Sequence, residues 1–116
     1  VTEANTAAAM GSGTLPVFAT PALVALMEKT AQESVQDALE EGCGSVGTMI
    51  CAKHVSATPV GMKVTCQSEL VAVEGRKLVF KITASDACGV VGEADHERFI
   101  IQNEKFLKKA NSKNEQ

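Results

Sequence analysis

One acidic side chain stands out because helical periodicity places it where a helix normally carries apolar residues. Residues 20–39 repeat apolar side chains at helical spacing, and Glu28 falls beside Val24 and Val35 at the edge of that apolar face. Its neighbours three and four positions away carry no positive charge, so the usual ion pair within a helix cannot form. A carboxylate in this position is either a solvated border residue or a base or nucleophile that acts on a carbonyl compound.

Two further polar residues have side chains suited to the same chemistry. Thr20 precedes Pro21, which fits the first turn of a helix, and Thr20 is therefore predicted to be the N-cap. The start of a helix also offers backbone N–H groups that stabilise a developing oxyanion. His54 shares one face of an alternating segment with Ile50 and Ala52, which indicates either a half-buried structural histidine or a group that moves protons.

The elements that must position these residues follow from a change of period after the helix. Alternating segments separated by Gly- and Pro-containing turns predict four strands, at residues 46–58, 63–74, 77–86 and 90–102. Residues 1–9 could hold an earlier strand, residues 104–110 a short helix, and the polar tail 111–116 is expected to be frayed. Short connections predict antiparallel pairing of consecutive strands. The prediction is a single α+β domain over residues 1–116 with two layers.

The alternation also predicts which side chains share a face of the sheet. In the third strand the four apolar residues that share one side are Leu78, Phe80, Ile82 and Ala84. In the first strand the predicted common face carries Val46, Thr48, Ile50, Ala52 and His54. His96 lies among Asp95, Glu97 and Arg98 and is predicted to belong to a charge network on the surface.

Composition excludes several classes of protein. The net charge of −3 and the absence of Trp and Tyr argue against nucleic-acid binding, and no apolar run approaches the ~18 residues of a membrane span. Residues 1–10 carry no signal-peptide pattern. Because no C-x-x-C pair occurs, we expect reduced thiols in a cytoplasmic protein, with neither a zinc site nor disulfides. The four cysteines are Cys43, Cys51, Cys66 and Cys88.

Several blocks of sequence together resemble the fluoroacetyl-CoA thioesterase-like family. They are residues 17–22 with Glu28 downstream, residues 54–61, residues 73–76 and residues 96–99. The likeness extends over nearly the whole chain. It implies a hot-dog fold, in which an antiparallel sheet wraps around one long central helix, and hydrolysis of a short or medium acyl-CoA.

The resemblance also implies roles for individual residues. The corresponding positions here are the catalytic Thr20, Glu28 and His54 and the substrate-lining Gly47, Arg98 and Phe18. The fluoroacetyl-specific member has further aromatic residues before the helix, where this chain has only Phe18, so fluoroacetyl specificity is not implied. No cofactor is expected, since coenzyme A is part of the substrate. The alternative function is a non-catalytic acyl-CoA-binding module of the same fold.

The spacing within the helix adds an expectation about assembly. Eight residues separate Thr20 from Glu28, or ~12 Å along a helix axis, which is too far for both to contact one small carbonyl group. Two antiparallel helices across a twofold axis would bring the start of one helix near the second turn of the other. We therefore expect a homodimer, or a dimer of dimers, with acyl-CoA sites at the interface.

Overall fold

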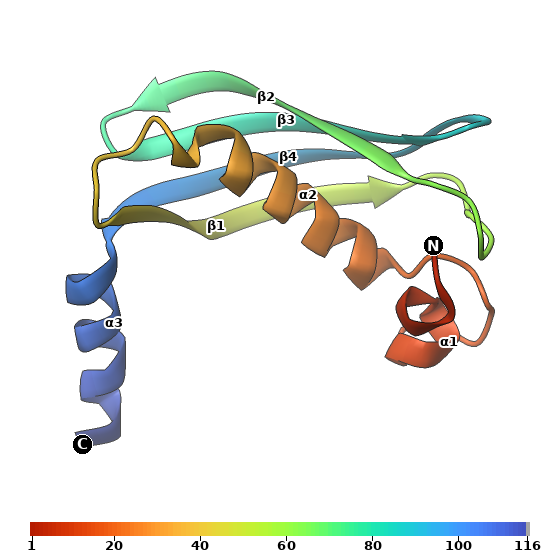
Figure 1. Cartoon of the computed structure of the whole chain (residues 1–116), viewed down its shortest axis with the longest axis horizontal. Coiled ribbons are helices and arrows are strands. Elements are labelled where there is room, and N and C mark those ends of the chain that lie inside the picture. The colour runs from red at the N-terminus through yellow and green to blue at the C-terminus, as the bar shows by residue number, and fades with distance from the viewer. Residues whose placement is uncertain (116) are drawn as a thin grey trace.

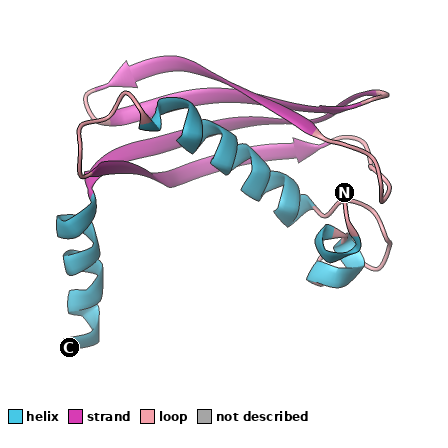
Figure 2. Ribbon diagram, viewed as in Figure 1, coloured by secondary structure: helices cyan, strands magenta, loops and turns pink. Residues whose placement is uncertain are grey.

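The computed structural model describes residues 1–115 and consists of one antiparallel sheet with a long helix packed on one face (Figure 1). The elements in chain order are η1 (Glu3–Asn5), α1 (Ala7–Met10), α2 (Thr20–Gln36), β1 (Cys43–His54), β2 (Thr65–Glu74), β3 (Lys77–Asp86), β4 (Gly89–Gln102), α3 (Asn103–Asn111) and η2 (Ser112–Glu115). Helix α2 crosses the sheet diagonally and contacts all four strands, whereas α3 projects away from the sheet (Figure 2). The predicted α+β class is confirmed.

The core lies between α2 and the inner face of the sheet. Helix α2 buries an apolar residue at every fourth position, and these residues are Leu23, Met27, Ala31 and Val35. Strand β3 faces them with the four apolar residues that the alternation predicted, Leu78, Phe80, Ile82 and Ala84, all of which are buried. Truncation of such a residue typically costs 2–5 kcal/mol of stability, so this contact fixes α2 against the sheet.

A β-bulge in β1 changes which of its residues face α2. The pairing of β1 with β4 shifts between Gly47 and Met49. Thr48 is exposed, and its hydroxyl donates to the carbonyl oxygen of Glu97 at 3.2 Å. Gly47, not Thr48, therefore lies on the inner face with His54. The prediction that Val46 and Thr48 share the face of His54 was wrong, because alternation assumes an unbroken ladder.

The order of strands across the sheet is β1-β4-β3-β2. Consecutive strands pair in the β2–β3 and β3–β4 hairpins, as predicted. Strands β1 and β2 instead lie at opposite edges, and residues 55–64 connect them. The prediction that consecutive strands pair was therefore wrong for β1 and β2, because β4 pairs with both β1 and β3 and so separates β1 from β2.

The ends of the chain also differ from the predictions. Residues 1–9 form η1 and part of α1 instead of a strand, and only Thr6 makes an isolated bridge to Phe18. Helix α3 confirms the predicted short helix. The tail that was expected to be frayed forms η2 over Ser112–Glu115, and Gln116 lies outside the described residues. None of the helices within residues 1–115 is long and apolar enough to cross a membrane.

Candidate active site

At the start of α2, Thr20 is joined to the end of β1. The N-cap of α2 is Ala19, and Thr20 is the first helical residue. Its hydroxyl oxygen lies 2.8 Å from Nδ1 of His54, in place of the capping hydrogen bond that the sequence predicted. The Nε2 atom of His54 is buried and has no hydrogen-bond partner among the described residues. Thr20 itself is exposed, so the pair lies at the protein surface.

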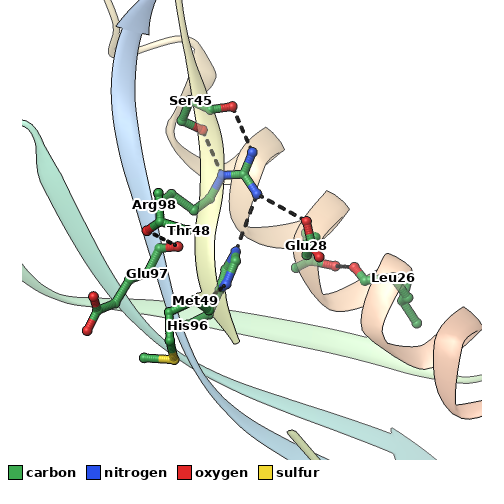
Figure 3. Close-up of polar contacts among 9 residues, drawn as sticks. Leu26, Glu28, Ser45, Thr48, Met49, His96, Glu97 and Arg98 are labelled. Carbon is green, nitrogen blue, oxygen red and sulfur yellow. Dashed lines mark hydrogen bonds and ion pairs between the residues drawn. The ribbon is translucent and has the colours of Figure 1, made fainter. Parts of the chain in front are cut away.

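Two turns further along α2, Glu28 meets a buried arginine. Arg98 is 5% exposed and comes from β4. Its Nε donates to the hydroxyl of Ser45 at 2.7 Å, and its Nη2 donates to the Ser45 carbonyl at 2.8 Å. Nη1 lies 3.7 Å from Oε2 of Glu28, whose side chain is 42% exposed (Figure 3). Burial lowers the pKa of the Arg98 guanidinium, and the Glu28 carboxylate acts in the opposite direction.

His96 holds the other side of that guanidinium. It is 1% exposed, and its Nδ1 lies 2.7 Å from the Met49 carbonyl, so Nδ1 carries the hydrogen. Nε2 is then free to accept from Nη1 of Arg98 at 3.3 Å (Figure 3). Burial lowers the pKa of His96, with Arg98 adding to this effect, while the Met49 hydrogen bond and Glu28 oppose it. His96 is therefore neutral at physiological pH.

The prediction that His96 belongs to a surface charge network was wrong. The charged residues adjacent to it in sequence point to the opposite face of β4, and Asp95 pairs there with Lys81. The signal that could have identified His96 was the alternation itself. His96 and Arg98 are two residues apart in a strand and therefore share a face.

Gly47 provides the space that Glu28 occupies. A Cβ atom at this position would lie 3.1 Å from Oε2 of Glu28, 3.3 Å from Cε1 of His96 and 3.5 Å from Nη1 of Arg98. A small cavity of about 240 Å³ opens here, and its lining includes Glu28, Gly47, Ile50 and His96. The bulge in β1 is what turns Gly47 toward this cavity.

The predicted catalytic residues thus fall into two groups along α2. Thr20 and His54 form one group at the helix start, and Glu28 forms the other with Arg98 and Gly47. Within residues 1–115 no hydrogen bond or ion pair links Glu28 to Thr20 or His54. The first group can polarise a carbonyl and move a proton, and the second offers a carboxylate with an open side.

Phe18 was predicted to contact substrate, and its side chain belongs to neither of these two groups. It is 6% exposed and packs in the core beneath the N-terminal segment. It lines a separate cavity of about 490 Å³ together with Met10, Leu26 and Val64. Its backbone N–H donates to the Thr58 carbonyl at 2.8 Å. The structure therefore gives Phe18 a role in packing before α2.

Comparison with known proteins adds to this geometry. The model of the fluoroacetyl-CoA-specific thioesterase family matches residues 1–104. A fluoroacetyl-CoA thioesterase of Streptantibioticus cattleyicolor is 44% identical over 97 residues, which cover 84% of this chain and 70% of that protein.

Solved structures agree with this match. The structure of the fluoroacetyl-CoA thioesterase FlK superposes with a TM-score of 0.91 at 39% identity, covering 97% of this chain and 88% of that one. A hypothetical protein of Thermus thermophilus, described as a thioesterase superfamily member, has a TM-score of 0.91 at 26% identity and covers 99% of this chain and 85% of its own. The fold is the predicted hot-dog fold, and the chain belongs to the fluoroacetyl-CoA-specific thioesterase family.

Proposed function

We propose that this chain is an acyl-CoA thioesterase that hydrolyses a short or medium acyl-CoA to the free acid and coenzyme A. The observation that carries the proposal is the setting of Glu28, a carboxylate that Arg98 holds beside the cavity at Gly47. Family membership supplies the reaction class, and a relative of 38% identity has been solved in complex with fluoroacetate and CoA. Because Phe18 is the only aromatic residue before α2, the proposal does not specify which acyl group is hydrolysed.

The polar groups supply what thioester hydrolysis requires. In the first turn of α2, Pro21 has no N–H and the N–H of Leu23 donates to the Ala19 carbonyl, which leaves the N–H groups of Thr20 and Ala22 to stabilise the oxyanion that forms on the thioester carbonyl. Glu28 either removes a proton from the attacking water or attacks the carbonyl carbon itself, and water then releases the acid. In both routes the carbon–sulfur bond breaks, a carbon–oxygen bond forms, and a proton passes to the thiolate. His54, hydrogen-bonded to Thr20, is the proposed donor of that proton.

We infer that the working form is a homodimer with two shared sites. Three observations support this. Thr20 is exposed and lies two turns from Glu28 on the same helix. Strand β1 pairs only with β4 among the described residues, so its other edge is open to a second copy. The radius of gyration is 16.1 Å, against the ~13 Å of a compact chain of this length, so a single copy is more extended than a compact monomer.

A cytoplasmic location remains part of the proposal. All four cysteines are free thiols in the structure. Free thiols suit a reducing compartment, which is the basis on which the sequence predicted this location.

The proposal is tested by thiol release from a panel of acyl-CoAs that includes acetyl-, fluoroacetyl- and medium-chain substrates. Glu28→Gln should lower kcat by at least about 10²-fold, because an amide cannot act as a base or a nucleophile. The matched control is Glu33→Gln on the solvent face of the same helix, where the Glu33 side chain is 62% exposed and pairs with Lys29. This control should keep wild-type turnover. Tight binding of every substrate without turnover would instead identify a binding module.

A further inference from the structure

A carboxylate outside the proposed site uses both of its oxygens to fix a turn. Thr58 is fully buried, and its hydroxyl donates to Oδ2 of Asp86 at 2.8 Å. Oδ1 of Asp86 accepts the backbone N–H of Cys88 at 2.8 Å. The hydrogen bonds from Cys88 and Thr58 lower the pKa of Asp86, so this carboxylate stays charged at neutral pH. The contact joins the β3–β4 turn to the loop that follows His54.

The same threonine holds the chain that leads into α2. Its carbonyl accepts the backbone N–H of Phe18 at 2.8 Å, and Val17 forms an isolated bridge with Pro59. Thr20 follows two residues after Phe18, and the intervening Ala19 is fully buried. The position of Thr20 therefore depends on the position of Thr58.

The β3–β4 hairpin also holds the backbone after His54. The carbonyl of Val91 accepts the N–H of Val55 at 2.8 Å and that of Ser56 at 3.3 Å. Val91 is 1% exposed and lies just beyond the turn that Asp86 closes. Both partners of the Thr20–His54 hydrogen bond are consequently anchored to one hairpin end, one through Thr58 and the other through Val91.

We propose that Thr58 and Asp86 are positioning residues that set the Thr20–His54 hydrogen bond and, through it, the rate of thioester hydrolysis. The inference rests on the proposed function for its kinetic consequence, but not for its structural one. The 2.8 Å contact between Thr20 and His54 tolerates little displacement before it is lost. The buried Leu23 still anchors α2, so removal of the Thr58–Asp86 hydrogen bond should shift the helix start without unfolding the domain.

The test compares Thr58→Val, which keeps the shape and removes the hydroxyl, with Thr58→Ser, which keeps the hydroxyl. Thr58→Val should lower kcat about tenfold with a smaller change in KM, as expected for misplacement by a fraction of an ångström. It should also move the ¹⁵N resonances of the His54 ring, since these report the hydrogen bond at Nδ1. Thr58→Ser should restore both. Asp95→Ala, which removes an exposed carboxylate paired with Lys81 on the outer face of the sheet, serves as control and should change neither.

The ring resonances distinguish a failure of this inference from a failure of the proposed function. They are measured without substrate, so they remain informative if no acyl-CoA is turned over. The inference is overturned if the His54 resonances of Thr58→Val match those of the wild type, whether or not kcat falls. If Thr58→Val does not fold, Asp86→Ala removes the acceptor of the same hydrogen bond at a half-exposed position and is measured in the same two ways.

Discussion

Gly47→Ala should displace the Glu28 carboxylate and lower activity while it changes the stability of the fold little. The added Cβ would lie 3.1 Å from Oε2 of Glu28 and 3.3 Å from Cε1 of His96. His96 is 1% exposed and hydrogen-bonded to the Met49 carbonyl, whereas the Glu28 side chain is 42% exposed and can swing toward solvent. The methyl group should therefore displace the carboxylate by a few tenths of an ångström.

The expected effects on activity and stability differ in size. A displacement of 1 Å can cost about 10²-fold in rate, so a few tenths should lower kcat by about three- to tenfold. Glycine in a strand interior is less favourable than alanine by about 0.5–1 kcal/mol, which offsets the new close contacts. The free energy of unfolding should consequently change by less than about 1 kcal/mol.

The assay is thiol release under saturating substrate, paired with chemical unfolding of both proteins. Cys51→Ala is the matched control, because Cys51 is exposed in the same strand and pairs with Asp95 on the face of the sheet away from Glu28. It should retain wild-type kcat. Unchanged kcat in Gly47→Ala would refute the reasoning, because the carboxylate would then tolerate the displacement that the geometry imposes.

Two further predictions follow from the shifted pKa values. Burial lowers the pKa of His96 below its ordinary 6.5, so the unfolded chain takes up this proton first as the pH falls. The free energy of unfolding should therefore decrease below pH 6.5. Chemical unfolding between pH 7.5 and 5 should show a smaller decrease for His96→Phe than for the wild type. Burial raises the pKa of Cys66 above 9.0, against an opposing hydrogen bond from Thr30, so this thiol stays protonated. Alkylation at pH 8, followed by peptide mass mapping, should modify the exposed Cys51 and Cys88 well before Cys66; equal rates at all three thiols would contradict this.

The alternation of a single strand was enough to predict part of the fold. The apolar face of β3 was predicted correctly because that strand lies inside the sheet and contains no inserted residue. The register shifts in its two ladders come from an extra residue in the neighbouring strand, Val71 in β2 and Val91 in β4. The same rule failed in β1, where the bulge after Gly47 inserts a residue that the pattern cannot show. Thr20 was expected to cap the helix from local rules alone. His54 comes from a distant part of the chain and competes for the same hydroxyl.

The site was predictable to the extent that its residues break a local pattern. Glu28 was identified because it lacks an ion-pair partner within its own helix, and the structure supplies that partner from β4. Arg98 was expected only from the family resemblance. His96 was missed because its neighbours in sequence are charged. Their side chains point to the opposite face, so local charge density gave the wrong environment.

Subunit mixing would decide how the two groups of polar residues combine. Glu28→Gln keeps Thr20 and His54, and His54→Ala keeps Glu28, so each variant alone should form inactive dimers. If each site takes the helix start from one copy and the carboxylate from the other, a mixed dimer contains one intact site and one that lacks both groups. Random exchange makes about half of all dimers mixed, so activity should recover to about a quarter of the wild-type value after mixing. A site contained within one chain would recover none, because every site would then carry one of the two substitutions.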